Sequence, residues 1–347
     1  MVDRSLIIRS DASFIHLLKQ INKSEGMAIY VVDDYEKLIG VVTDGDIRRG
    51  FINGLSEHDR IEKFMFTDFH YLTDKEIDIE KLINLRNSKL RSVPILSDTN
   101  KIIDIIDFSK QKSLLPIDAI IMAGGKGTRL LPLTNDKPKP LIKINGKEII
   151  SYNIDRLNYF GIKNQNITTN YLSEKIFEFC ENYHDPNIKF NVIKEEEYLG
   201  TAGSISLVKN FFNDTVLLMN SDLLTNIDYE DFYLSFKRNQ ADVMVASYPY
   251  KVTVPYGVFN VENHRINSIN EKPTFSYFSN AGIYLIKKEI LKLIPNNEYY
   301  NATDLLEKVI KLNKSVLQYP ITNYWLDIGK HDDLDKALDD IYHIDFN

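Results

Sequence analysis

Apolar and polar positions repeat one pattern twice in the first third of the chain. In each copy an amphipathic segment of helical period precedes two β-branched runs, which are joined by a polar turn, DDYEK or SDTNK. The run that begins at Ile29 falls on the run that begins at Val93, and the run that ends at Thr43 falls on the run that ends at Asp107, a constant shift of 64 residues. This self-similarity predicts two copies of one unit, at about residues 5–58 and 69–112.

The pattern changes after Pro116. Residues 117–122 form a near-continuous apolar run that ends at two glycines, as a buried parallel strand followed by a loop does. Helical stretches then alternate with further apolar runs, which include LIKI, NITTN, FNVIK, TVLLMNSD and DVMVASY. We therefore predict a boundary near residue 115, with one domain at 1–115 and an α/β domain with a mostly parallel sheet at 116–347.

Length and composition agree with two globular domains. The chain has 347 residues, of which 44% are hydrophobic and 26% charged, so wholesale disorder is not expected. No apolar run approaches the roughly 18 residues of a membrane span, and the start lacks the apolar core of a secretory signal, so we expect a cytoplasmic protein. The single cysteine, Cys180, excludes an internal disulfide and a cysteine-based zinc site.

The net charge bounds the class of ligand. Lysine and arginine number 42 against 49 acidic residues, a formal charge of -7, which argues against a general nucleic-acid binder. An anionic small substrate must then meet a local basic site. The string AGGKGTRL, from Ala123 to Leu130, offers one, because its glycines let backbone N–H groups approach an anion closely and it carries Lys126 and Arg129. Its spacing is neither that of a Walker loop nor that of a dinucleotide fingerprint.

Several further strings place the loop in a known context. The loop is followed by PKPL and then, in order, by EEEYLGTAGS, LLMNSDLL, PYGVF, NEKP, NAGIYLI and YWLDIG. This series resembles the nucleotidyltransferases that make nucleoside-diphosphate sugars. The resemblance implies a Rossmann-like α/β fold with its active site at the carboxyl ends of the strands. It also implies attack of a sugar 1-phosphate on the α-phosphorus of an NTP, with Mg²⁺ as cofactor and pyrophosphate as leaving group.

The resemblance assigns the catalytic and metal-binding roles. Arg129 would clamp the β- and γ-phosphates, and Lys139 would neutralise charge at the α-phosphate. Lys137 is the nearby alternative, because strand alternation puts Lys137 and Lys139 on one face. Asp222 and Asp327 would bind the metal, although an aspartate just after a strand is also a common turn cap. The nucleotide would in addition contact Ala123, Gly124, Gly125, Glu195, Gly200 and Thr201.

The sugar phosphate has its own implied residues. In the family Glu271 would hold sugar hydroxyls and Lys272 would meet the phosphate, with the pocket completed by Gly257 and Asn280. Outside this context EKP is an ordinary surface turn, so these roles rest on the resemblance.

Glu195 bears on the choice of base. A carboxylate prefers hydrogen-bond donors, and guanine presents two adjacent N–H donors where uracil and thymine present one and adenine presents an acceptor. GTP is therefore the expected substrate. The alternative is that residues 195–197 form a solvated acidic turn.

The string GVVTDGDIRR, which ends the first repeat, resembles the signature of a CBS domain, so the repeats resemble a CBS tandem. In that family Thr43 and Asp46 would hydrogen-bond the ribose and phosphate of an adenosine nucleotide. The second copy has Asp107 and Lys110 at these positions, and an acidic residue there would repel a phosphate. The alternative for Thr43 and Asp46 is a helix cap.

A CBS tandem ahead of such a domain looks like the bacterial guanylyltransferases that activate glucosamine 1-phosphate for legionaminic acid synthesis. Mannose- or heptose-1-phosphate guanylyltransferases share the same catalytic motifs, so the sugar stays open. A nucleotide-sensing regulator without turnover would predict damage to the basic loop or the carboxylates, and Arg129, Lys139, Asp222, Lys272 and Asp327 are all present. We expect a homodimer, because symmetric dimers are the commonest assembly.

Overall fold

The computed structural model describes residues 3–75, 77–183, 185, 188–344 and 346. They form two compact units. The first comprises Met1–Leu115 with Tyr159–Gly161, and the second comprises Pro116–Asn158 with Ile162–Asn347.

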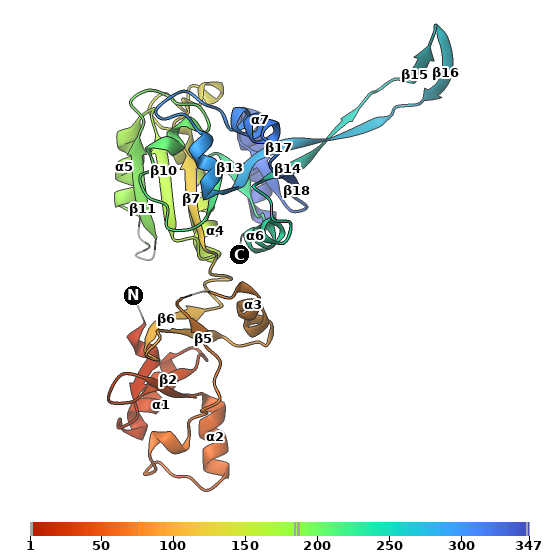
Figure 1. The fold of residues 1–347 in the computed structure, drawn as a ribbon. Coiled ribbons are helices and arrows are strands. Elements are labelled where there is room, and N and C mark those ends of the chain that lie inside the picture. The colour runs from red at the N-terminus through yellow and green to blue at the C-terminus, as the bar shows by residue number, and fades with distance from the viewer. Residues whose placement is uncertain (1–2, 76, 184, 186–187, 345, 347) are drawn as a thin grey trace. The chain divides into compact units, whose positions relative to one another are not determined.

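The first unit contains two three-stranded sheets with the same connectivity (Figure 1). In each sheet the first two strands are parallel and the last two antiparallel. The elements of the first repeat are η1 (Arg4–Leu6), β1 (Ile7–Arg9), α1 (Phe14–Lys23), β2 (Ile29–Val32), β3 (Leu38–Val42), α2 (Asp44–Ile52) and η2 (Ile61–Lys63). Those of the second are β4 (Leu72–Thr73), α3 (Ile79–Asn87), β5 (Ser92–Leu96) and β6 (Ile102–Asp107).

Strand register repeats as the sequence does. Val31 pairs with Gly40 and, after a bulge, Val32 pairs with Leu38. In the second sheet Ile95 pairs with Asp104 and, after a bulge at the same place, Leu96 pairs with Ile102. The internal repeat is therefore present in the backbone pairing, down to its bulge, at the same shift of 64 residues.

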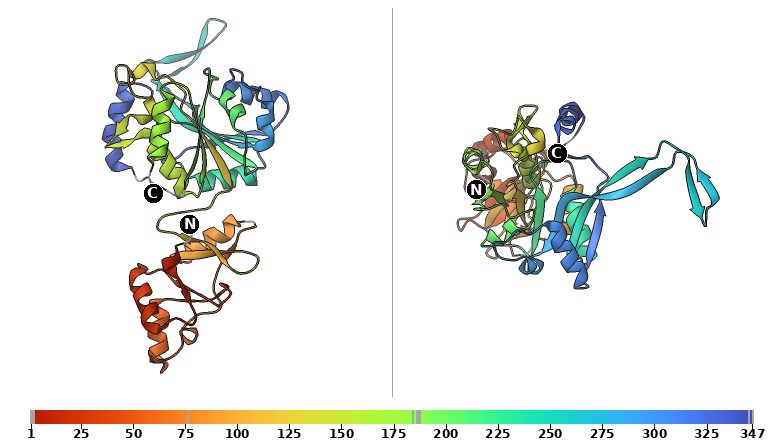
Figure 2. Two further views of the ribbon diagram at one scale, coloured as in Figure 1. Left: turned by 90° about the vertical axis from the view of Figure 1, so that its left-hand side faces the viewer. Right: turned by 90° about the horizontal axis from the view of Figure 1, so that it is seen from above.

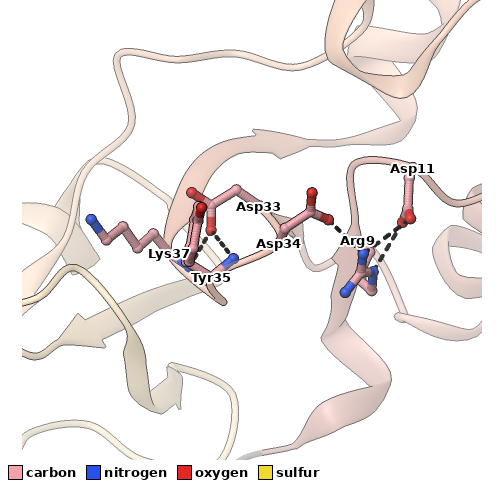
Figure 3. A network of polar contacts seen from close by, with 6 residues as sticks. All are labelled: Arg9, Asp11, Asp33, Asp34, Tyr35 and Lys37. Carbon is pink, nitrogen blue, oxygen red and sulfur yellow. Dashed lines mark hydrogen bonds and ion pairs between the residues drawn. The ribbon is translucent and has the colours of Figure 1, made fainter.

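A polar network holds the first of the predicted turns (Figure 3). The Asp33 carboxylate accepts hydrogen bonds from the backbone N–H groups of Tyr35 and Lys37, at 2.9 and 2.8 Å. Arg9, at the end of β1, donates to both Asp11 and Asp34. An aspartate that bonds the backbone two residues on is a common way to close a turn.

The second unit is built on a seven-stranded sheet in the order β11-β10-β7-β12-β17-β14-β18. All neighbouring strands are parallel except for the two pairs made by β17. The predicted α/β fold with a mostly parallel sheet is confirmed. The strands are β7 (Ile117–Met122), β10 (Asn164–Thr169), β11 (Lys189–Lys194), β12 (Thr215–Asn220), β14 (Val243–Thr253), β17 (Thr274–Lys287) and β18 (Val316–Pro320).

Helices cover both faces of this sheet (Figure 2). Leu305 and Val309 of α7 pack with Ile120 and Leu218 on one face. On the other face the Tyr229 hydroxyl of α6 lies 3.7 Å from the sulfur of Met219. The helices are α4 (Ile149–Tyr159), α5 (Ser173–Glu181), α6 (Tyr229–Arg238), α7 (Ala302–Lys311) and α8 (His331–Asp340), and the short 3-10 helices are η3 (Thr128–Leu130), η4 (Lys139–Leu141), η5 (Gly203–Leu207), η6 (Lys288–Leu293) and η7 (Ile341–His343).

Three two-stranded sheets complete the unit. They pair β8 (Lys143–Ile144) with β9 (Lys147–Glu148), β13 (Leu223–Thr225) with β19 (Trp325–Asp327), and β15 (Val258–Glu262) with β16 (Arg265–Asn270). The run LIKI, expected as a strand of the main sheet, contributes only two residues to the first of these sheets. In the part of the chain that the structure describes, no helix has the length and apolar character needed to cross a membrane.

Beyond the sheet, β14 and β17 continue as a two-stranded ribbon that ends in the β15–β16 hairpin (Figure 1). We call residues 248–280 the arm. The structure describes the whole of this range, and none of its residues is buried. From Pro249 onward, the arm thus extends away from the core of the second unit.

Candidate active site

The glycine-rich loop connects the carboxyl end of β7 to η3. The Ala123 N–H donates to the Thr168 carbonyl at 2.7 Å, which ties the start of the loop to β10. Gly127 has a φ of 62°, in the left-handed region, and a Cβ there would lie 3.0 Å from side-chain carbons of both Lys139 and Thr134. Both its backbone conformation and its crowded surroundings therefore require glycine.

We expect Gly127→Ala to destabilise the protein by about 1–2 kcal/mol, the usual cost of a non-glycine residue in the left-handed region. Gly125→Ala is the matched control, because a Cβ at Gly125 meets no atom within 4 Å. Urea unfolding of both variants measures the difference. Equal stabilities would show that the loop tolerates a side chain at either position.

A lysine and two aspartates meet at the floor of this loop. Antiparallel pairing of β13 with β19 places Leu223 opposite Asp327, so Asp222 and Asp327 are neighbours although 105 positions separate them in the chain. The Lys139 ammonium donates to Oδ2 of Asp222 and lies 3.9 Å from Oδ1 of Asp327. The Lys139 side chain is only 9% exposed. A buried cation thus sits between two carboxylates at the carboxyl edge of the sheet.

These carboxylates have unused acceptor capacity. Oδ1 of Asp222 and Oδ1 of Asp327 are shielded from solvent and receive no hydrogen bond from any described residue. Burial raises the pKa of Asp327, and the nearby charge of Asp222 raises it further. Shielded, unbonded carboxylate oxygens are costly unless a cation satisfies them. The pair therefore fits a hard divalent cation. No group of three His, Cys, Asp or Glu side chains that could hold a metal occurs among the described residues, so the remaining ligands of this cation would be water and phosphate oxygens.

Arg129 lies at the rim of the same cluster. A Cβ at Gly329 would come within 3.2 Å of its guanidinium nitrogens, so the guanidinium lies directly against that glycine, two residues after Asp327. Arg129 is exposed, and its donors bond no other described residue. A forked donor set is thus free to bind an anion beside the carboxylates.

These groups line one cleft of about 370 Å³. The loop, the cation and the carboxylates all contribute to its walls. Of the residues named from the sequence, it contains Gly124, Gly125, Arg129, Lys139, Glu195, Gly200, Thr201, Asp222 and Asp327. Ala123, the first residue of the loop, is buried. The structure therefore gathers the predicted nucleotide, catalytic and metal residues at one place.

The structure separates Lys137 from Lys139. Lys137 is exposed, whereas Lys139 is buried in the cleft. The segment was expected to be extended, but Lys139 begins the 3-10 helix η4 instead, with Pro140 in its first turn. Strand alternation does not apply there, which is why the two lysines point to different surroundings.

Glu195 is not part of a solvated turn. It is 2% exposed, whereas Glu196 and Glu197 are both exposed. Its Oε2 accepts the Leu199 N–H at 3.0 Å, and its Oε1 approaches the backbone of Gly124 so closely that a Cβ there would lie 2.8 Å away. Burial raises the pKa of this carboxyl. One carboxylate oxygen thus fixes the following loop, and the residue lines the cleft beside Gly124.

The residues expected to hold the sugar phosphate lie elsewhere. Gly257, Glu271 and Lys272 are on the arm, all exposed, and none of them lines the cleft. The Glu271 carboxylate does lie close to Gly257, since a Cβ at Gly257 would meet its Oε2 at 3.0 Å. Asn280, at the root of the arm, donates to the Tyr284 hydroxyl at 2.7 Å. These residues do not join the cleft of their own chain.

Sequence reasoning did not name several other residues of the cleft. Tyr198 is 45% exposed at its wall, and its ring lies 6.1 Å from that of Tyr299, which makes an aromatic edge where a base could stack. Its position inside EEEYLGTAGS was the available signal. The other lining residues, to which the sequence assigned no role in the site, are Met122, Gly127, Thr128, Pro140, Asn220 and Ser221.

Comparison with known proteins places this arrangement in a family. Residues 118–343, more than half of the chain, match the family model described as nucleotidyl transferase. The chain belongs to the nucleotidyl transferase family. Residues 1–53 match the model of the CBS domain, so this nucleotidyl transferase carries a CBS domain at its N-terminal end.

Several relatives are guanylyltransferases by name. The chain is 31% identical to a D-glycero-α-D-manno-heptose 1-phosphate guanylyltransferase from Aneurinibacillus thermoaerophilus, over 65% of this chain and 99% of that one. It is 29% identical to a mannose-1-phosphate guanyltransferase from Yarrowia lipolytica, over 62% of this chain and 61% of that one. The chain likewise spans only 51–60% of the length of other curated relatives it matches.

The fold is similar to that of a solved relative. HddC from Yersinia pseudotuberculosis, in a complex with GMP-PN, superposes with a TM-score of 0.51 at 26% identity, over 65% of this chain and 99% of that one.

A second cavity, of about 290 Å³, lies in the first unit. Thr43 and Asp46 line it, together with Tyr30, Phe66 and His70. The two residues also form a capping box at the start of α2, in which the Asp46 carboxylate accepts the Thr43 N–H at 2.8 Å. The helix cap weighed from the sequence is therefore present, and the same residues face a cavity. At the matching place in the second repeat, Asp107 accepts from Ser109 and pairs with Lys110 at 3.5 Å.

Proposed function

We propose that this protein transfers a nucleoside monophosphate from an NTP to a sugar 1-phosphate and releases pyrophosphate. The observation that carries the proposal is the cleft in which Arg129 and Lys139 meet Asp222 and Asp327 beside a glycine-rich loop. A reaction between two phosphate anions needs cations and backbone donors more than it needs a covalent nucleophile.

Each group has a role that follows from its position. Backbone N–H groups of residues 124–127 would approach the triphosphate, and the guanidinium of Arg129 would bind its β- and γ-oxygens. Lys139 is held by carboxylates on the cleft floor, so its ammonium is positioned to neutralise charge that develops at the α-phosphate. Asp222 and Asp327 would hold Mg²⁺, which would supply positive charge to neutralise the phosphates.

Guanine is the base we propose. The relatives named as guanylyltransferases support it, and so does Glu195, a buried carboxylate that lines the cleft. Because burial strengthens a hydrogen bond to a charged acceptor, the N–H edge of guanine gains more from this group than the other bases do.

Glucosamine 1-phosphate is the sugar substrate we propose, for a surface or flagellar glycan of the legionaminic acid type, on the combination of a CBS module with a guanylyltransferase. Mannose 1-phosphate and heptose 1-phosphate are the alternatives, and the names of two relatives favour them.

A pyrophosphate-release panel tests the whole proposal. Four NTPs are combined in turn with glucosamine, N-acetylglucosamine, mannose, heptose and glucose 1-phosphates in the presence of Mg²⁺. We expect turnover with GTP and glucosamine 1-phosphate. Turnover with only mannose or heptose 1-phosphate would make that compound the sugar substrate in place of glucosamine 1-phosphate. Turnover with another NTP would make its base the one recognised in place of guanine. Nucleotide binding without pyrophosphate release from any pair would favour a non-catalytic regulator.

Glu195→Gln separates the two roles of this carboxyl group. Since the folded-state pKa of Glu195 lies above its ordinary value of 4.5, its contribution to stability is present below that value and is lost as the pH rises through the raised pKa. Glutamine has no such loss, so the variant gains stability relative to wild type as the pH rises from 4.5 to 8. Its preference for GTP falls by about 10–100-fold, because guanine N–H groups lose a charged acceptor.

Melting temperatures across that pH range and kcat/KM ratios for GTP against the other NTPs measure the two effects. Glu196→Gln, on the exposed neighbour, is the control and leaves both unchanged. Unaltered base preference in Glu195→Gln would assign the residue to loop structure alone.

For the first unit, a regulatory adenosine nucleotide in the cavity lined by Thr43 and Asp46 is the accompanying proposal. Its aromatic walls suit a base, and the N-terminus of α2 suits a phosphate. Calorimetric titration of the full chain with AMP and ATP tests it. Binding heat in the wild type that disappears in Thr43→Val supports the site. Identical titration curves for the wild type and Thr43→Val would mean that the nucleotide binds elsewhere.

A further inference from the structure

The arm has one apolar face in each of its two segments. At the root, Tyr250 pairs with Tyr277 and Val252 pairs with Phe275, so all four side chains point the same way. They are 39–62% exposed. The opposite face of this segment carries Lys251, Thr253, Thr274 and Ser276, together with Pro249 and Phe278.

The terminal hairpin repeats this arrangement. Phe259 pairs with Ile269 and Val261 pairs with Ile266, and the four side chains are 53–60% exposed on a common face. Asn260 and Ser268 occupy the other face. A sheet with one apolar and one polar face is the pattern of a sheet that covers a core on its apolar side, and a lone hairpin is marginally stable in water. The apolar face therefore needs a partner surface.

The size of that face matches a stable protein interface. The two paired segments, Tyr248–Thr253 and Val258–Glu262, are about 20 and 16 Å long and about 10 Å wide, which gives about 360 Å² for their two apolar faces together. Together they are comparable to the largest apolar patch on a typical monomer, which is often a functional surface. If two arms were covered and their partner surfaces counted as well, about 1,400 Å² would be buried, within the roughly 1,200–2,000 Å² of a standard interface.

The arm also carries groups that the cleft lacks. If the proposed function holds, the cleft must bind a second anion, the sugar phosphate, but Lys139 is already paired with Asp222 and Arg129 is assigned to the triphosphate. Lys272 forms no hydrogen bond or ion pair within the described part of the chain, and its φ of 43° is an unusual conformation for a lysine. Residues held in such conformations cluster at binding sites.

The arm leaves the sheet at the same edge as the cleft. Strand β14 is parallel to β7 and β12, so the arm leaves the sheet at the carboxyl edge, where the cleft opens. Its root stays paired without interruption from Ser247 and Asn280 to Thr253 and Thr274, which keeps it in line with the sheet. A twofold axis that brings two such edges together would lay each arm along the other copy.

We propose that two copies of this chain exchange arms, and that Gly257, Glu271 and Lys272 of each copy complete the sugar-phosphate site in the cleft of the other. The apolar faces of the arms are then buried in the dimer. Each active site combines the loop, cations and carboxylates of one chain with the arm of its partner.

Cross-linking tests the exchange without relying on turnover. Lys272→Cys chains are mixed with differently tagged Thr128→Cys chains and treated with a short bismaleimide. Thr128 lines the cleft, and the only native cysteine, Cys180, is buried. We expect a product that contains both tags. The control is a double variant that carries both substitutions in one chain, because an arm that folds back on its own cleft would be cross-linked within that chain. If this control gives a cross-link within one chain and the mixture gives no product with both tags, the proposal is overturned.

Complementation tests the function of the exchanged arm. Lys272→Asn, which suits a left-handed backbone, and Asp222→Asn are each expected to lose at least about 100-fold in turnover. Co-expressed with two tags and purified as mixed dimers, they should recover about half of the wild-type turnover per dimer, because twofold symmetry gives each mixed dimer one intact site. No recovery by cross-linkable mixed dimers overturns the proposal, since a site built within one chain always keeps one defect.

The two proposals fail in different ways. A wild type that forms the two-tag product but releases no pyrophosphate in any combination refutes the nucleotidyltransferase activity. A wild type that turns over as a monomer in sedimentation equilibrium refutes the exchange of arms and leaves the activity intact.

Discussion

Asp222→Asn should lower Mg²⁺-dependent pyrophosphate release by about 10³-fold or more while the protein stays folded. Asp222 supplies a carboxylate oxygen that no described residue satisfies, and its neighbour Asp327 supplies the other. Removal of one charge from this pair weakens the hold on a cation that would contribute several kcal/mol to charge stabilisation, and each 1.4 kcal/mol is a factor of ten in rate. Turnover at increasing Mg²⁺ concentrations measures the effect.

Asp118→Asn is the matched control for this variant. Asp118 is also buried, but it lies near the start of β7, at the opposite end of the strand from the cleft, where its carboxylate accepts the N–H groups of Phe212 and Asn213 at 2.7 and 2.8 Å. We expect it to lose about 1–3 kcal/mol of stability and to keep its turnover per folded molecule. If Asp222→Asn keeps near-normal turnover with an unchanged Mg²⁺ dependence, Asp222 is not a metal ligand.

Much of the fold was predictable because burial imposes regular patterns on the sequence. Continuous apolar runs such as 117–122 and 215–220 are strands of the central sheet, and the repeat in the first unit persists in its register. A central strand is apolar on both faces and a repeated unit must bury the same positions twice, so each leaves a signal that needs no tertiary information.

Within the candidate site, the limits of sequence reasoning come from backbone geometry. Strand alternation left Lys137 and Lys139 equivalent, because it assumed an extended segment where the chain forms a 3-10 helix. The motif singles out Glu195 for the base, but the sequence leaves open a solvated turn of three acidic residues, and the packing of Glu195 against Gly124 shows that it is buried. Such contacts join distant segments and leave no periodic trace.

The arm marks a different limit. The strings PYGVF and NEKP identify residues that resemble a sugar-phosphate site, but their order along the chain carries no information about which copy of the protein they serve. The apolar residues of 258–262 and 265–270 gather on one face of two paired strands, and that face is exposed in the single chain. Under the proposed exchange of arms, what covers that face is a property of assembly, which a single sequence does not encode locally.

Lys139→Met should also lower turnover strongly, by about 10²–10³-fold, the usual loss when one preorganised group that stabilises transition-state charge is removed. The buried ammonium is bonded to Asp222, so the variant also leaves that carboxylate without its partner. Removal of one member of a buried ion pair costs about 3–5 kcal/mol. Lys137→Met, two positions earlier and exposed, is the matched control and should keep both turnover and stability.

A double variant separates the two consequences of losing Lys139. In Lys139→Met/Asp222→Asn the uncompensated charge is gone, so much of the lost stability should return, because a neutral amide is far cheaper to bury than an unpaired carboxylate. Turnover should stay at least as low as in either single variant, since the double variant restores neither the ammonium of Lys139 nor the carboxylate of Asp222. Urea unfolding and initial rates of the four proteins in this cycle measure both quantities. If stability and turnover recovered together, neither group would be needed for the chemistry, and the loss in Lys139→Met would come from the uncompensated charge on Asp222.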